Sequence, residues 1–184
     1  MNKGGRGRGQ GTGTLGVSER IEAVPRPTSP TDRAPSLSIA PELFDADGSG
    51  WVMAQAEAEL TARYGFLGDG ELSLAPDVFA PPRGLFLVGR IGSDSPPAGG
   101  VGLRPLTETS AEVKRLWVDP ARRGQGVGLA LMDALEAAAR DLGYATLRLE
   151  TGPKQPEAIA LYAGSGWTRR DGPDDEFRFF KELR

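Results

Sequence analysis

A glycine-rich turn at residues 124–128 constrains the fold of this chain more than any other segment, because it joins a strand pattern to the most regular helix pattern. Before the turn, residues 111–118 predict a strand, which Asp119-Pro120 ends. After it, apolar residues recur at helical spacing from Val127 to Leu142, and glycine follows at 143. A strand that passes through a tight turn into an amphipathic helix indicates a strand–helix–strand crossover, and therefore an α/β chain.

The other patterns between residues 36 and 184 alternate between strand and helix. We expect strands at 37–43, 85–88, 99–103, 146–150 and 177–181, and helices at 54–64, beginning near Gly50, and at 156–163. Residues 65–82 predict mostly loop, because glycine and proline interrupt them repeatedly. Two strand–helix–strand units with hairpin-like connections fit one domain over residues 36–184.

Residues 1–35 differ from the rest of the chain. They are rich in glycine, arginine and proline, and such a segment cannot bury enough surface to offset its chain entropy, so we predict a disordered tail. The tail carries six basic and three acidic residues, a net charge of +3, against −6 for the remainder. A basic arm could contact RNA or an acidic partner, but the two arginines of Arg6-Gly7-Arg8-Gly9 supply little phosphate affinity. We therefore expect no nucleic-acid partner, and a solvated leader is the simpler interpretation.

The chain contains neither cysteine nor histidine. It therefore has no disulfide, no thiolate nucleophile, no imidazole base and none of the commonest zinc ligands, so we expect no metal site. Acid–base chemistry must then use Asp, Glu, Tyr, Lys or backbone groups. The apolar runs are far shorter than the roughly 20 residues that span a bilayer, and the first residues lack the apolar core of a secretory signal. We accordingly expect a cytoplasmic protein with no membrane partner.

Residues 122–128 have the chemistry of an anion site. Glycines let a ligand approach the backbone, the first N–H groups of the following helix lack helical partners, and arginines add positive charge. A pyrophosphate fits such a concavity, whereas the alternative is a tight turn that merely needs glycine. The segment is neither a dinucleotide fingerprint, which has a different glycine spacing, nor a P-loop, which needs Gly-Lys-Ser/Thr.

Arg123-Gly124-Gln125-Gly126-Val127-Gly128 resembles the acyl-CoA pyrophosphate loop of the GNAT superfamily of N-acetyltransferases, whose pattern is Arg/Gln-x-x-Gly-x-Gly/Ala. Residues 113–120 resemble the strand before that loop, and residues 158–162 with Gly166-Trp167 resemble the closing segment of the family. The resemblance covers about residues 98–168 and is weaker over 37–97. It implies a single GNAT-like domain of the mixed α/β (α+β) class, with a twisted mixed sheet and helices on both faces.

The resemblance also implies that acetyl-CoA is the acyl donor. The backbone of Leu116, Trp117 and Val118 would pair with pantetheine, and a strand amide could polarise the thioester carbonyl. Gln155 stands where many family members carry asparagine and could retain that hydrogen bond. The pyrophosphate would lie against the loop, which consists of Arg123, Gly124, Gln125, Gly126, Val127 and Gly128.

Two residues are candidates for the proton transfers. Glu112 precedes the loop on the same strand, in a place comparable to the glutamate base of the family, and could deprotonate an amine. The alternative is a strand carboxylate that pairs with Lys114 or Arg115. Tyr162 belongs to the matching Leu-Tyr pair and could protonate the departing CoA thiolate, whereas the alternative is a tyrosine that only packs against the sheet.

We therefore expect an N-acetyltransferase that moves an acetyl group from acetyl-CoA to a primary amine of a small molecule or peptide by direct attack in a ternary complex. The alternatives are a catalytically silent acyl-CoA-binding regulatory module, and an RNA- or protein-interaction module that works through the tail. No motif selects the acceptor amine, whose site the first helix, residues 65–82 and residues 169–176 would shape. Dimers are common in the family, so a homodimer is the assembly to test.

Overall fold

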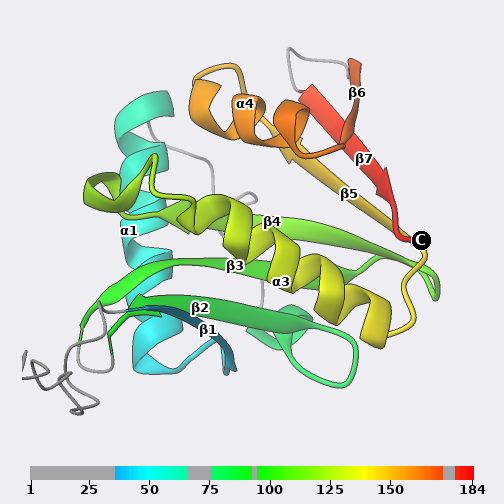
Figure 1. The fold of residues 1–184 in the computed structure, drawn as a ribbon, viewed down its shortest axis with the longest axis horizontal. Helices are drawn as coiled ribbons and strands as arrows, with labels where there is room; N and C mark the ends of the chain where they lie inside the picture. The colour runs from blue at the N-terminus through cyan, green and yellow to red at the C-terminus, as the bar shows by residue number, and fades with distance from the viewer. Residues whose placement is uncertain (1–35, 66–75, 93–94, 172–176) are drawn as a thin grey trace, which may run out of the picture. The chain divides into compact units, whose positions relative to one another are not determined.

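The computed structural model describes residues 36–65, 76–92, 95–171 and 177–184, which form a mixed α/β fold (Figure 1). The strands are β1 (Leu37–Glu42), β2 (Leu85–Ile91), β3 (Pro97–Pro105), β4 (Ser110–Val118), β5 (Thr146–Thr151), β6 (Thr168–Asp171) and β7 (Phe177–Glu182). The helices are α1 (Asp47–Tyr64), α3 (Val127–Asp141) and α4 (Pro156–Gly164), with short 3-10 helices η2 (Pro76–Phe79) and η3 (Pro120–Arg122). The predicted tail lies outside the described residues, so a domain boundary at residue 35 stays a prediction.

Every strand and helix expected from the sequence is present, with three additions and one longer helix. β6, η2 and η3 were not predicted, and η2 falls within the expected loop. Helix α1 begins at Asp47 rather than near Gly50. The Ser49 hydroxyl donates to the carbonyl oxygens of Phe44 and Ala46, each at 3.0 Å. These contacts stabilise the first turn of α1, which contains Gly48 and Gly50.

The seven strands form one mixed sheet in the order β1-β2-β3-β4-β5-β7-β6. β4 and β5 are parallel and are joined through α3, as the predicted first crossover requires. The second predicted crossover joined the strand at 146–150 through the helix at 156–163 to a strand at 177–181. Its last strand is wrong, because α4 leads first to β6. β7 then returns antiparallel between β5 and β6.

The ladder between β4 and β5 is short. Ser110, Ala111 and Glu112 pair with Thr146, Leu147 and Arg148, and no pairing continues beyond them. Figure 1 shows the two strands diverging from this point. Among the described residues no strand pairs with this edge of residues 113–118, so the sheet opens there.

Helices α1 and α3 cover opposite faces of the sheet, and β3 lets both approach closely. A Cβ added to Gly99 would lie 3.1 Å from Leu131 of α3, whereas one added to Gly100 would lie 3.1 Å from Val52 of α1. Because successive strand residues face opposite sides, these two glycines explain the glycine-rich pattern of β3. The larger core lies under α3 and α4, and the smaller one lies between α1, η2 and the sheet. No helix in the described parts of the chain combines the length and the apolar character that a membrane span requires.

Candidate functional site

A pocket of about 820 Å³ lies where β4 and β5 diverge. Its walls come from α1, β4, the loop after β4, the start of α3, the end of β5 and α4. Most of the residues proposed from the sequence line it, namely Leu116, Trp117, Val118, Arg123, Gly124, Gly126, Val127, Gly128, Gln155 and Tyr162. The structure therefore brings together residues that are up to 46 positions apart in the sequence. Of the proposed residues, Glu112 and Gln125 do not line the pocket.

The glycine loop has the backbone conformation that its sequence suggests. Gly124 and Gly126 have φ angles of 73° and 83°, in the left-handed region that other residues rarely adopt. A Cβ on either would meet no atom within 4 Å, so conformation rather than space requires glycine here. Gly126 is the N-cap of α3, and the N–H of Ala130 donates to its carbonyl at 3.0 Å. The amides of residues 127–129 therefore precede the helical ladder and are available as donors at the pocket wall.

Gln125 stabilises this turn with its side chain. Its Nε2 donates to the carbonyl of Ala121 at 3.0 Å, and the Asp119 carboxylate accepts from the N–H of Ala121 at 3.0 Å. Gln125 is exposed and outside the pocket, so the predicted contact of its amide with a pyrophosphate stays a prediction.

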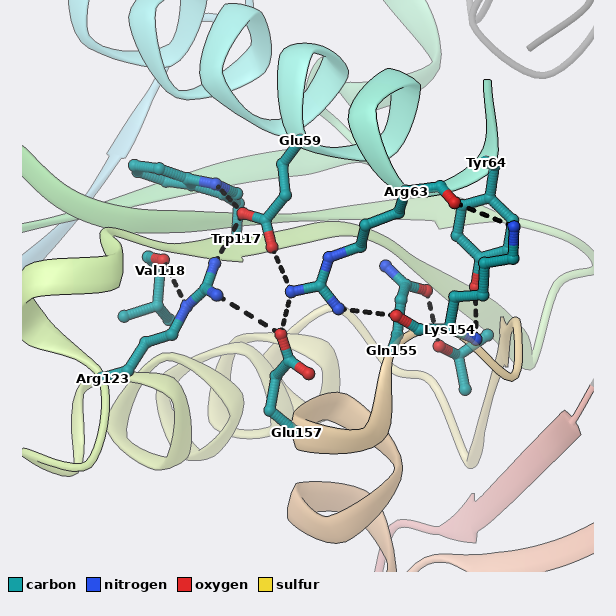
Figure 2. Close-up of polar contacts among 10 residues, drawn as sticks. Glu59, Arg63, Tyr64, Trp117, Val118, Arg123, Lys154, Gln155 and Glu157 are labelled. Carbon is teal, nitrogen blue, oxygen red and sulfur yellow. Dashed lines mark hydrogen bonds and ion pairs between the residues drawn. The ribbon is translucent and has the colours of Figure 1, made fainter. Parts of the chain in front are cut away.

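Arg123 is held by two carboxylates across the pocket (Figure 2). Its Nη2 lies 2.5 Å from Glu59 Oε2, its Nη1 lies 3.3 Å from Glu157 Oε1, and its Nε donates to the carbonyl of Val118 at 3.1 Å. The guanidinium that the sequence assigns to a phosphate is thus neutralised by protein groups in this structure.

Arg63 and Trp117 extend this set of contacts. Arg63 forms ion pairs with both Glu59 and Glu157, and its Nη1 donates to the carbonyl of Lys154 at 2.6 Å (Figure 2). The Trp117 indole donates to Glu59 Oε2 at 2.9 Å. Sequence analysis missed Glu59, Arg63 and Glu157, and the only local signal was the i,i+4 spacing of the first two on α1.

The two carboxylates of this network are shifted toward their ionised forms. Burial alone would raise the pKa of Glu59, but the hydrogen bonds and charges of Arg123 and Arg63 outweigh it, so the pKa lies below its ordinary value of 4.5. The hydrogen bond from Arg63 is the main reason that the pKa of Glu157 is also lowered. Both groups therefore stay charged at neutral pH and keep the arginines in place.

Gln155 is the N-cap residue of α4 and lines the pocket. Its Oε1 accepts a hydrogen bond from the Thr151 hydroxyl at 2.7 Å. Among the described residues its amide nitrogen has no partner, so a donor is left for a ligand. That is compatible with the hydrogen bond expected where the resembled family often has asparagine.

Tyr162 both packs in the core and borders the pocket. Its ring centroid lies 5.3 Å from that of Phe179 and 6.0 Å from that of Trp167, and the residue is only 5% exposed. Within the described part of the chain its hydroxyl has no hydrogen-bond partner. Burial raises the pKa of this hydroxyl, so it remains protonated and can act as a donor.

Glu112 is fully buried and lies outside the pocket wall. Its Oε2 accepts a hydrogen bond from Arg104 Nε at 2.6 Å, while Oε1 lies 3.5 Å from Lys114 Nζ and 3.4 Å from Arg148 Nη2. The pairing with Lys114 that the sequence left open is therefore present. A role as the base stays a prediction.

A smaller pocket of about 250 Å³ adjoins the large one, because Glu150 lines both. Its other wall residues are Arg148, Leu149, Arg178 and Phe180. Glu150 and Arg178 form an ion pair, with 3.0 Å between Oε1 and Nε. Sequence analysis missed this pocket, because its residues come from β5 and β7, whose pairing no motif indicates. Within the ranges that the structure describes, no group of three acidic side chains is placed to hold a metal ion.

Comparisons with known proteins identify the family of this chain. Residues 42–167 match the Acetyltransferase (GNAT) family. The chain is 35% identical over 150 residues to the IAA acetyltransferase of Azospirillum brasilense, covering 76% of this chain and 93% of that protein. It is 33% identical over 172 residues to the uncharacterised N-acetyltransferase YjgM of Escherichia coli K12, covering 85% and 97%. The crystal structure of the PaiA N-acetyltransferase from Thermoplasma acidophilum in complex with coenzyme A has the same fold, with a TM-score of 0.63, 17% identity and coverage of 80% and 99%.

Proposed function

Because this chain belongs to the GNAT acetyltransferase family, we propose that it transfers an acetyl group from acetyl-CoA directly to a primary amine in a ternary complex. One observation carries the proposal. A single pocket joins the glycine loop at the start of α3, the unpaired edge of β4 and the free hydroxyl of Tyr162. These are the groups needed to bind a diphosphate, an extended pantetheine and a thioester sulfur.

The proposed donor lies along this pocket. The amides of residues 127–129 and the positive end of α3 receive the diphosphate, and the backbone of residues 116–118 pairs with pantetheine like an added strand. The solved relative that holds coenzyme A supports this choice of ligand. In this proposal Arg123 exchanges its contacts with Glu59 and Glu157 for contacts with the diphosphate when the donor binds.

The proposed reaction removes one proton from the attacking amine and shares one with the leaving thiolate. The neutral amine attacks the thioester carbonyl carbon, the C–N bond forms, and an amide of β4 stabilises the oxyanion. When the C–S bond breaks, the Tyr162 hydroxyl donates a hydrogen bond to the departing thiolate. Since burial raises the pKa of Tyr162, a shared proton is the form of acid assistance that this hydroxyl supports best.

Glu112 is the proposed acceptor of the amine proton. Its Oε1 accepts no hydrogen bond from the described residues, so this oxygen can receive a proton. Because Glu112 is outside the pocket wall, the proton passes through an intervening water. Arg104, Lys114 and Arg148 hold this carboxylate in place.

The alternative function is acyl-CoA binding without catalysis, and the burial of Glu112 among three cations is the observation that favours it. An assay of acetyl-CoA consumption with the full chain and a broad library of amines decides between them. We expect turnover with at least one primary amine. Thermal stabilisation by acetyl-CoA with no turnover across the library would instead indicate a binding module.

A further inference from the structure

One carboxylate holds three cations at the end of the β4–β5 ladder. The register places Arg104 of β3 opposite Glu112 and Glu112 opposite Arg148 of β5, and Lys114 lies two residues further along the same face of β4. All three cationic groups lie within 3.5 Å of the Glu112 carboxylate. The group of four, which we call the Glu112 cluster, therefore has a charge of 3 − 1 = +2.

The next charged groups on this face do not compensate the surplus. Glu150 of β5 lies opposite Arg178 of β7, and the two form an ion pair with 3.0 Å between the charged atoms. This pair is neutral by itself. Glu182, opposite Thr146 on this face, is an exposed carboxylate, and among the described residues no ion pair joins the Glu112 cluster to a second carboxylate.

The cluster also has more donors than acceptors. Arg148 Nε is buried and has no hydrogen-bond partner in the described chain. The Lys114 ammonium has the carboxylate at 3.5 Å and no hydrogen-bond acceptor within those same residues. Buried polar groups are normally hydrogen-bonded. Arg148 Nε is therefore a buried donor left available to an anionic group, and it lies beside a partly exposed Lys114 ammonium that faces the large pocket.

The cluster borders both pockets. Arg104 and Lys114 line the large pocket, Arg148 lines the small one, and Glu150 belongs to both walls. Lys114 precedes Val118 by four strand residues, or about 13 Å, so this charge is well separated from the glycine loop. The phosphates of the proposed donor therefore do not account for it.

We propose that Arg104, Lys114 and Arg148 bind a carboxylate of the acceptor, so that the acceptor is an amine that also bears a carboxylate, as an amino acid or a short peptide does. The inference rests on the proposed acetyl transfer, because the large pocket then brings the thioester to the same region of the sheet. A guanidinium and an ammonium with unused donors fit a carboxylate in both charge and hydrogen bonding. A polyamine, which carries only positive charge, is repelled by the surplus.

Binding is measured first, without turnover. The full-length protein is saturated with CoA, which carries no acetyl group to transfer, and is titrated calorimetrically with the common amino acids, their carboxamides and spermidine. We expect the best-bound amino acid to bind about tenfold more tightly than its carboxamide, and spermidine not to bind. Lys114→Met and Arg148→Met should each lower that ratio to about threefold or less. Arg140→Met, on exposed α3 surface, is the matched control and should leave the ratio unchanged.

The outcomes separate this inference from the proposed function. Equal binding of acids and carboxamides, no binding of any amino acid, or a ratio that neither variant lowers would overturn the carboxylate site. The same compounds are then incubated with acetyl-CoA. Carboxylate-selective binding without acetylation would keep the site and contradict acetyl transfer, whereas equally fast acetylation of carboxamides and spermidine would keep acetyl transfer and overturn the site. Melting temperatures of the variants verify that each one is folded.

Discussion

Glu112 lies opposite Arg148 in the last pair of residues that joins β4 to β5. Beyond this pair β4 continues to Val118 and β5 continues to Thr151 without pairing, so the sheet opens directly after it. Glu112 is therefore the last residue of β4 that pairs with β5, and its carboxylate contacts three cations near the proposed reaction site. Its substitution is the most informative test of the proposed chemistry.

Glu112→Gln should lower kcat by about 10²- to 10⁴-fold if this carboxylate accepts the amine proton. CoA affinity should stay nearly unchanged, because Glu112 does not line the pocket. Steady-state kinetics across pH and calorimetric titration with CoA measure both quantities. A normal rate and pH profile would remove Glu112 from proton transfer.

Glu136→Gln is the matched control for that variant. Glu136 is also buried, and its carboxylate pairs with Lys181 at 2.6 Å, but it lies on α3 away from the pocket. Both variants disturb a buried ion pair and should lose stability in a similar way. Only Glu112→Gln should lose turnover, and a change confined to the KM of the acceptor would point to a positioning role instead.

Gly126→Glu should weaken CoA binding by at least about tenfold, because it places negative charge where the diphosphate is proposed to bind. Isothermal titration with CoA tests this directly. Gly143→Glu is the control, since Gly143 also has a positive φ, of 85°, and open space around its missing Cβ. Both changes should cost about 1–2 kcal/mol of stability through backbone strain. An unchanged CoA affinity in Gly126→Glu would contradict the assignment of the loop.

The parts of the fold that sequence could predict are those with a local signal. α3 was predictable because its apolar residues keep one period, and the glycine loop was predictable because a left-handed turn needs glycine. β6 has no such signal. Thr168–Asp171 consists of four polar residues at the edge of the sheet and pairs only with β7, so neither alternation nor an apolar run identifies it.

The site likewise contains residues that local motifs predict and residues that only the fold brings in. Most residues of the motifs line the pocket, because the glycine loop and the end of β4 lie where the sheet opens. The contacts of Arg123 could not be predicted, because Glu59 and Glu157 lie on helices 64 positions before it and 34 positions after it. Glu136 is a further case, because this charged residue of α3 is buried and pairs with Lys181, 45 positions later on β7.

Tyr162→Phe should slow acetyl transfer by about 10²-fold with little loss of stability, because the hydroxyl that it removes has no partner among the described residues. Tyr144→Phe is the opposite case. The Tyr144 hydroxyl donates to the carbonyl of Arg83 at 2.7 Å, so its loss should cost about 1 kcal/mol and leave the rate unchanged. Chemical denaturation and initial rates distinguish the two. A large loss of stability in Tyr162→Phe would support a purely packing role.

The raised pKa of Tyr162 has a consequence at alkaline pH. The hydroxyl ionises near pH 10.0 in the unfolded chain and at a higher pH in the folded one. The stability that it contributes is therefore complete below pH 10 and is lost as pH rises toward the folded value. Unfolding free energies measured between pH 8 and 11 should fall less steeply in Tyr162→Phe than in the wild type. Equal slopes would contradict the burial of an ionisable hydroxyl at this position.

The network around Arg123 should make the fold sensitive to acid. The pKa values of Glu59 and Glu157 are lowered below 4.5, so the stability that they contribute is present above that pH and is lost as pH falls through their folded values. Melting temperatures between pH 7 and pH 3 should therefore drop more in the wild type than in a Glu59→Gln/Glu157→Gln variant. Because Glu157 is 42% exposed, high salt should reduce the difference between the two proteins. The same acid dependence in both would mean that these carboxylates do not link α1 and α4 to the loop in solution.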